Sequence, residues 1–281
     1  MLRGPADIDL IRTAEDDPGS RRLPNSWAAL LILGVVVALV AGGGYLFVRR
    51  ARPVPPAEVA TGAPPAVKVQ QEAAQITLPP LEDTDGLVRQ LVGELLSHPV
   101  IAAWLTTDRL IVNFVVATHR ITEGQSPAAE LKAIGPIAPF RARTSQGGAV
   151  VDPSSYRRYD RYAQAVAALD ARGAVRVYET LKPRVDEAHR NFGGTGDFNA
   201  EIERAIVELL KVPVVDGAIA LQPAGIGYAY TDPRLETMSA AQKQLFRMGP
   251  DNVRAVQGKL REIASLLSIP ESRLPRPGAL E

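Results

Sequence analysis

Residues 27–48 read WAALLILGVVVALVAGGGYLFV and contain no charged side chain. As a helix that rises about 1.5 Å per residue, this stretch is roughly 33 Å long, which matches a hydrocarbon core of about 30 Å. A helix satisfies its own backbone hydrogen bonds in lipid, and Trp27 and Tyr45 lie where interfacial aromatic residues are expected. The stretch therefore predicts a single transmembrane helix, to which the rest of the chain is attached.

Two other interpretations of this stretch compete with the anchor. A cleaved signal peptide needs a cleavage site of small residues, such as Ala41-Gly42-Gly43, but the apolar run continues to Val48. A buried helix of a soluble domain would show a polar face over such a length. Basic residues flank the stretch almost equally on both sides, so they leave the orientation open. The Pro/Ala-rich segment after it suits an exported domain, and we expect the N-terminus in the cytoplasm.

The remaining chain divides into four parts. Residues 1–26 carry acidic and Pro/Gly-rich sequence and are predicted to be a disordered cytoplasmic tail. Residues 49–80 are rich in Pro and Ala and cannot close a core, so they are predicted to be a linker. Residues 81–270 are long enough for one globular domain, and residues 271–281 are predicted to be a flexible tail.

Charge and cysteine content exclude several classes of protein. Six of the 32 basic and five of the 31 acidic residues precede residue 51, so the later part of the chain carries equal numbers of each. A neutral domain lacks the electrostatic footprint of a nucleic-acid-binding protein. Cysteine is absent, which excludes disulfides, thiolate nucleophiles and Cys-ligated metals.

The pattern of residues 81–270 predicts a mainly α fold. Apolar residues recur at helical spacing in most of this part. Residues 123–152 are predicted to be a long loop with a brief strand near Phe140, and residues 218–230 a hairpin. Pro183 implies a break or kink in its helix. The fold class is therefore a single transmembrane helix, a linker and one mostly helical domain with at most a small β-hairpin. The helices are predicted from Thr84 or Asp85 to Pro99, over 101–105, 108–121, 152–171 and 174–192, after Asp197 or Asn199, from the capping box Ser239-x-x-Gln242 to Gly249, and from Asp251 onward.

The most distinctive polar stretch is YRRYDRY, residues 156–162. On a continuous helix its tyrosines share a face, and tyrosine and arginine together are typical of recognition surfaces. The alternative is that the tyrosines pack into the core with their hydroxyl groups satisfied. The candidate binding residues of this stretch are Tyr156, Arg157, Tyr159, Asp160 and Arg161.

A second stretch adds Tyr230, Asp232 and Arg247 to the candidate binding surface. It reads as a strand that enters a helix, followed by a capped exit. Turn chemistry alone also explains its Asp, Pro and Gly residues.

No complete catalytic or metal-binding motif is evident, and no cofactor is predicted. The three histidines share no metal-ligand spacing, and the pair Asp186 and His189 is more typical of a structural hydrogen bond than of a site. The enzymatic alternative is a hydrolase of an envelope polymer, for which carboxylates such as Asp160, Asp232 and Glu236 would have to converge in a cleft.

Four segments carry a resemblance to a known family. They are LPPLEDTD (78–85), DPSSYRRYDRY (152–162), Phe198-Asn199 and YAYTDPRLETMSAAQKQLFRMGPDN (228–252). Together they resemble the bacterial domain-of-unknown-function family number 3014. The resemblance implies a bacterial, single-pass, envelope-facing protein, and it carries no known activity or catalytic residue. The chain departs from the family pattern at His119-Arg120 and at His189, which argues against a catalytic role for either histidine.

The expected function is that of a membrane-anchored interaction or scaffold module of the bacterial inner membrane, with its C-terminal domain in the periplasm. Its expected partners are the membrane and an envelope protein, not nucleic acid, and self-association is left open. A small-ligand sensor is the third hypothesis, and it requires an enclosed pocket lined by the tyrosines.

Overall fold

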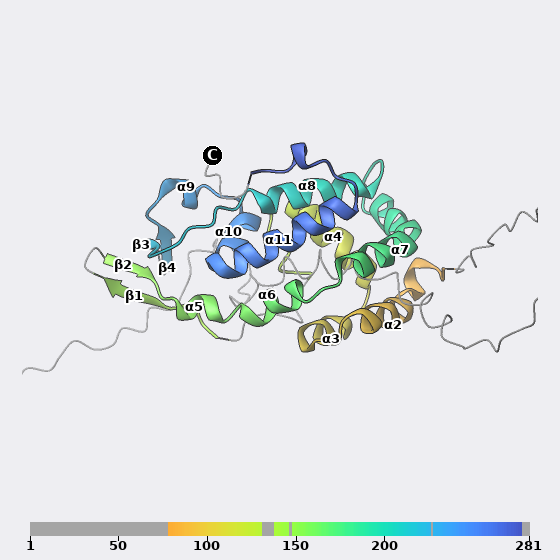
Figure 1. Ribbon diagram of the computed structural model, residues 1–281, viewed down its shortest axis with the longest axis horizontal. Coiled ribbons are helices and arrows are strands. Elements are labelled where there is room, and N and C mark those ends of the chain that lie inside the picture. Colours follow the sequence, from red (N-terminus) through yellow and green to blue (C-terminus); the bar gives the residue numbers. More distant parts are fainter. Residues whose placement is uncertain (1–77, 131–137, 146–147, 226, 277–281) are drawn as a thin grey trace, which may run out of the picture.

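The computed structural model describes residues 78–130, 138–145, 148–225 and 227–276. Helices predominate in these residues, and four short strands form one antiparallel sheet. Figure 1 shows the sheet at one end of the long axis, with the helices extending away from it. The mainly helical prediction is confirmed, whereas the limit of one small hairpin is wrong, because a second hairpin joins the first.

The helices and strands follow one another in a simple order. Apart from the short 3-10 helices η2 and η3, the described residues form three α-helices, the first hairpin, four α-helices, the second hairpin and three more α-helices, in this order. The elements are η2 (Leu81–Asp83), α2 (Asp85–Leu95), α3 (Pro99–Leu105), α4 (Leu110–Thr122), β1 (Ala142–Ser145), β2 (Gly148–Val151), α5 (Ser154–Arg157), α6 (Asp160–Ala167), α7 (Ala171–Asn191), α8 (Phe198–Leu210), β3 (Ala220–Ala224), β4 (Gly227–Tyr230), α9 (Pro233–Glu236), α10 (Ala240–Phe246), α11 (Pro250–Leu266) and η3 (Glu271–Arg273).

The predicted transmembrane helix, residues 27–48, lies outside the described residues. Among the residues that are described, no single helix is long and apolar enough to cross a bilayer. Only α3 and α4 taken together meet that length and composition, with a bend of 108° between them.

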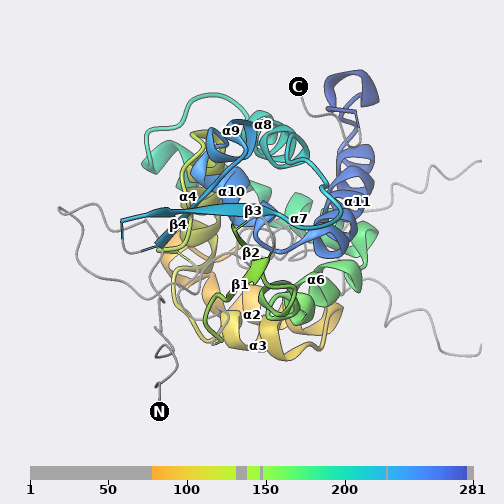
Figure 2. The same cartoon turned by 90° about the vertical axis from the view of Figure 1, so that its left-hand side faces the viewer.

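The sheet has the strand order β1-β2-β3-β4, and all of its pairs are antiparallel. Its centre joins distant parts of the chain, because Val150 of β2 pairs with Ala220 of β3. Figure 2 looks onto this end of the molecule and shows the strands in front of the helices. The predicted loop over residues 123–152 therefore contains two strands, of which β2 pairs with a segment far along the sequence and β1 pairs with β2.

The core lies between the long helices. The helix α11 packs against α6, α7 and α8, and α4 packs against α7 and α8. The largest fully buried side chains of the core include Trp104, Tyr162, Tyr178 and Phe198. Phe114 of α4 meets Phe198 of α8 edge to face, with ring centroids 5.3 Å apart.

Two predicted helices differ from those in the structure. The helix predicted over residues 152–171 is broken into α5 and α6 at Arg158-Tyr159. Pro183 does not break its helix as one of the two predicted outcomes had it, since α7 extends from Ala171 to Asn191. Pro183 is exposed, so solvent can satisfy the carbonyl group whose helical hydrogen bond a proline removes.

Local cap signals predicted several helix starts correctly. Asp197 accepts a hydrogen bond from the backbone N–H of Asn199 and begins α8. Ser239 and Gln242 form the predicted capping box of α10, with both reciprocal hydrogen bonds present.

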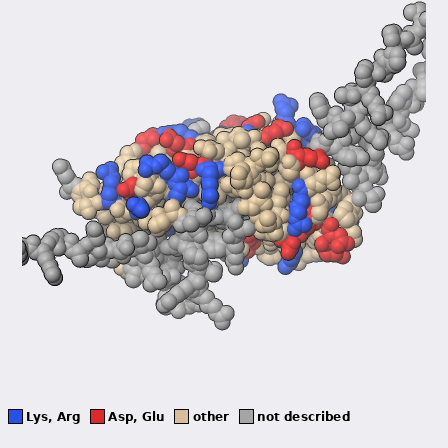
Figure 3. All heavy atoms as spheres, turned by 90° about the horizontal axis from the view of Figure 1, so that it is seen from below, with Lys and Arg blue, Asp and Glu red and all other residues tan. Residues whose placement is uncertain are grey.

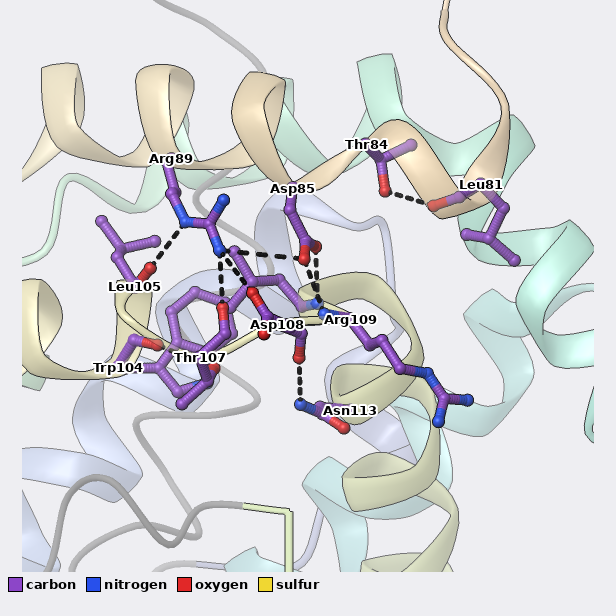
Figure 4. Close-up of polar contacts among 11 residues, drawn as sticks. Leu81, Thr84, Asp85, Arg89, Trp104, Leu105, Thr107, Asp108, Arg109 and Asn113 are labelled. Atoms are coloured by element: carbon purple, nitrogen blue, oxygen red, sulfur yellow. Dashed lines mark hydrogen bonds and ion pairs between the residues drawn. The ribbon is translucent and has the colours of Figure 1, made fainter.

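Asp85 has a different role from the predicted cap of its own helix. Its Oδ2 accepts from the N–H of Arg109 at 2.6 Å, and its Oδ1 accepts from the N–H of Leu110 at 2.9 Å. It thus caps the start of α4, where Arg109 adopts a left-handed conformation with φ 59°. Arg89, one turn along α2, donates to the carbonyl groups of Leu105 and Thr107, and Figure 4 shows how these contacts join α2 to the turn between α3 and α4.

Candidate functional site

The stretch YRRYDRY presents only some of its side chains to solvent. Tyr159 and Tyr162 are about 1% and 0% exposed and belong to the core, as the alternative interpretation of the tyrosines proposed. Arg157 and Arg161 are exposed, and Tyr156 and Asp160 are half-buried. The three tyrosines therefore do not form an exposed recognition face, because Tyr159 and Tyr162 are buried and α5 ends before Tyr159.

A groove of about 250 Å³ lies between this stretch and the start of α11. Its two walls come from segments about 90 residues apart in the sequence, and Asn252 joins them. The Nδ2 of Asn252 donates to Asp160 Oδ1 at 3.0 Å on one wall and to the carbonyl of Met248 at 2.9 Å on the other. The groove is lined by Pro153, Tyr156, Arg157, Asp160, Met248, Gly249, Pro250, Asp251 and Asn252.

Gly249 and Tyr156 set the floor of the groove. Gly249 has φ 84° and ψ 164°, a conformation that essentially only glycine adopts. A β-carbon at this position would lie 2.5 Å from Tyr156 Cγ, so the tyrosine ring rests directly on the glycine backbone. Burial, with a smaller effect of Tyr230, raises the pKa of the Tyr156 hydroxyl to about 12. The hydroxyl therefore stays protonated at neutral pH and can donate a hydrogen bond.

Tyr230 and Arg247 do not line this groove, although Tyr230 is close enough to Tyr156 to affect its pKa, and Asp232 has a local role. Burial lowers the pKa of the Arg158 guanidinium, and the neighbouring positive charge of Arg247 lowers it further. Tyr230 meets Phe246 edge to face at 5.3 Å. Asp232 accepts from the N–H of Arg234 and caps α9, as its turn chemistry suggested.

The three carboxylates of the hydrolase hypothesis each have a separate structural contact. Asp160 accepts from Asn252, and Asp232 caps α9 and pairs with Arg234 at 2.8 Å. Glu236 pairs with Lys243 at 2.6 Å and accepts from the N–H of Tyr230. These contacts argue against a convergent catalytic pair of the kind that glycoside hydrolysis needs.

A buried carboxylate that the sequence analysis did not single out lies on α8 and contacts α4. Glu201 of α8 is 3% exposed and accepts from Thr122 Oγ1 at 2.7 Å, and it lies 3.1 Å from His119 Nδ1. Arg204 contacts its other oxygen. Only the polar residues at the end of α4 hinted at such a partner, because helical spacing places His119 and Thr122 on one face.

The pKa of Glu201 has consequences for acid stability. Burial alone would raise this pKa, but hydrogen bonds from Thr122, Arg204 and His119 outweigh burial and hold the pKa below its ordinary value of 4.5. The ionised carboxylate therefore stabilises the fold above pH 4.5, and this contribution is lost as the pH falls through the lower folded-state value.

We expect the free energy of unfolding of Glu201→Gln to depend less on pH below 4.5 than that of the wild type. Urea denaturation from acidic to neutral pH measures this dependence. Glu123→Gln, which changes an exposed glutamate, is the matched control and should retain the wild-type slope. An unchanged slope in Glu201→Gln would show that this carboxylate does not contribute to acid unfolding.

His189, which the sequence paired with Asp186, is buried and packs on Phe198 with ring centroids 5.2 Å apart. Asp186 instead pairs with Lys182 at 2.8 Å. Across the described ranges of the chain, no group of three His, Cys, Asp or Glu side chains could hold a metal ion.

Residues 110–264 match the family model described as protein of unknown function (DUF3014). The match spans more than half of the 281 residues. The chain belongs to this family. Both walls of the groove lie within the matched part of the DUF3014 chain, whereas α2 and Asp85 precede it. No curated protein and no solved structure matches the chain.

Proposed function

We propose that this DUF3014 chain is a single-pass membrane-anchored protein of the bacterial envelope, and that its folded part binds a partner protein through the groove between α5–α6 and α11. The observation that carries the proposal is the groove itself. Two segments far apart in the sequence build it, a glycine backbone supports its tyrosine, and exposed Arg157 and Asp251 lie along its rim. Tyrosine and arginine around a shallow groove are typical of a protein-binding surface.

The anchor and the linker complete this proposal. An apolar stretch over residues 27–48 suits a helix in the inner membrane, and the Pro/Ala-rich residues 49–80 suit an extended connection to the folded part in the periplasm. The linker would let the groove reach a partner at a distance from the membrane surface.

The other two functions receive less support from the geometry. A small-ligand sensor needs an enclosed pocket of about 300–1,000 Å³, and the groove is smaller and open. Tyr159 and Tyr162, which were candidates to line such a pocket, are buried in the core instead. A hydrolase needs free carboxylates that converge, and each of its three candidates has a structural partner.

The proposal is tested by photo-crosslinking in cells. A photo-crosslinking amino acid replaces Arg157 or Asp251 in the full-length chain, and Arg172 or Arg190 on α7 serves as the matched exposed control. We expect a discrete adduct with one protein from the two groove positions only. We also expect the adduct to remain with the membranes after an alkaline carbonate wash.

Three results would contradict the proposal. Adducts of equal yield from the groove and from α7 would show that the groove has no special role. The absence of an adduct from both groove positions would argue against a protein partner at this site. Release of the full-length chain by the carbonate wash would argue against an integral anchor.

A further inference from the structure

The end of the molecule beside the groove has an excess of positive charge. Residues 138–145 and 148–162 contain five arginines and only two aspartates, although the chain after residue 50 is neutral as a whole. Figure 3 shows basic side chains gathered over the left part of this face, where β1, β2 and α5 lie in Figure 1. The charge is therefore separated in space in a way that the overall composition conceals. The arginines are Arg141, Arg143, Arg157, Arg158 and Arg161, and the aspartates are Asp152 and Asp160.

Three exposed arginines at this end form no direct ion pair within the described residues, unlike many other arginines of the protein. Among the residues that the structure describes, Arg141, Arg143 and Arg157 are exposed and form no ion pair. Hydrogen bonds from Ser154 are the largest cause that lowers the pKa of Asp152, and the nearby positive charges of Arg143 and Arg141 lower it by a smaller amount without a direct ion pair. We call Arg141, Arg143 and Arg157 the basic rim. It has the capacity to pair with carboxylates from another molecule.

The two acidic residues of the groove also have intramolecular partners, although the side chain of Asp251 is 96% exposed and keeps its negative charge at the rim. Asp160 accepts from Asn252, and Asp251 pairs with Arg254 at 3.0 Å. The part of the groove that is left for a ligand is formed by the ring of Tyr156, by Pro153 and by Pro250. Its volume of about 250 Å³ is sufficient for one large apolar side chain.

We propose that the basic rim and the groove together bind an extended acidic segment of the partner protein, with one apolar side chain seated in the groove and the flanking carboxylates on the basic rim. This inference rests on the proposed function and names the chemistry of the partner. A protein segment fits better than a lipid surface, because a planar layer of headgroups has no single side chain to place in a narrow groove beside Tyr156. Complementary charge would also direct the approach of the segment.

The test measures binding by fluorescence anisotropy, with the full-length chain in mild detergent. The probe is a labelled short peptide of alternating Glu and Ala with one central Leu. We expect it to bind, and its Lys counterpart to fail. Affinity should fall with added salt, because the rim is exposed and its charges are screened. Replacement of the central Leu by Gly should weaken binding as well.

Protein variants separate the surface from the net charge. R141E/R143E/R157E should weaken binding by roughly tenfold or more, because each exposed pair is replaced by repulsion. R172E/R176E/R190E changes the same number of exposed arginines on α7 and should leave affinity within about twofold. Asp251→Asn removes a negative charge from the groove and should strengthen binding. Thermal melts of each variant verify that it is folded.

Several outcomes would overturn the inference. Equal losses in the two triple variants would mean that only net charge matters. Indifference to the central Leu or to Asp251→Asn would remove the groove from the site. Binding of dihexanoyl-phosphatidylglycerol with the same dependence on the rim, without peptide binding, would assign the surface to lipid. If the crosslink from position 157 forms but the acidic peptide does not bind, the proposed function stands and the acidic segment is wrong.

Discussion

Gly249→Ala is expected to lower the free energy of unfolding by about 2–6 kcal/mol. Two effects add. The backbone at φ 84° and ψ 164° is strained for any residue with a β-carbon, which costs about 1–3 kcal/mol. The new methyl group would also lie within 2.8 Å of three atoms of Tyr156, and overpacking of this kind costs about 1–3 kcal/mol. Chemical denaturation of the two proteins measures the difference.

A glycine inside α11, the helix that Gly249 precedes, provides the control. Gly258 of α11 has helical geometry, and nothing lies within 4 Å of an added β-carbon. Gly258→Ala should therefore stabilise the protein by about 0.5–1 kcal/mol, the usual gain for alanine in a helix. Equal stability of Gly249→Ala and the wild type would contradict the close contact of Tyr156 with the glycine backbone.

Asp85→Ala is expected to destabilise the fold by about 2–3 kcal/mol. The carboxylate is 18% exposed and accepts two backbone N–H groups at the start of α4, and without it both donors lose their partner. The turn between α3 and α4 would also lose one of its connections to α2, whereas the hydrogen bonds from Arg89 would remain. Urea denaturation measures the change, and hydrogen exchange at Arg109 and Leu110 localises it.

Two variants make this result specific. Asp85→Asn keeps one oxygen acceptor and should cost less than Asp85→Ala. Asp108→Ala removes the other carboxylate near Arg89, but its side chain is 89% exposed and its surface ion pair is worth at most about 1 kcal/mol. If Asp108→Ala proves as costly as Asp85→Ala, the cap on α4 does not account for the effect.

Features encoded locally could be predicted from the sequence. The caps at Asp197 and Ser239 depend on residues within a few positions of each other, and they were predicted correctly. β1 begins two residues after Phe140, near which a brief strand was predicted, but its hairpin with β2 could not be predicted, because ARTS and GAVV are short and lack an alternating pattern. β1 pairs only with β2, and β2 also pairs with the distant β3. Single-sequence periodicity contains no information about such a distant partner.

The candidate site likewise combines features that the sequence predicted with features that depend on distant contacts. Three residues of the candidate binding surface, Tyr156, Arg157 and Asp160, line the groove, whereas Tyr230, Asp232 and Arg247 are not among its lining residues. The sequence analysis placed Tyr159 on the same surface, because a continuous helix was assumed and the break at Arg158-Tyr159 has no local signal such as proline or glycine. The partner of Asp85 at Leu110 and that of Glu201 at His119 are tertiary contacts, so only the three-dimensional structure reveals them.

The central pairing of the sheet has a consequence for biosynthesis. Val150 precedes its partner Ala220 by about 70 positions, which a ribosome needs roughly 4–14 s to add. During this interval the β1–β2 hairpin has been made but the strand that completes the sheet has not, so β2 has an unpaired edge. The hairpin has only four residues on each side and ends in the apolar pair Val150-Val151. The nascent chain therefore passes through a stage in which one short apolar edge must avoid other chains until β3 emerges.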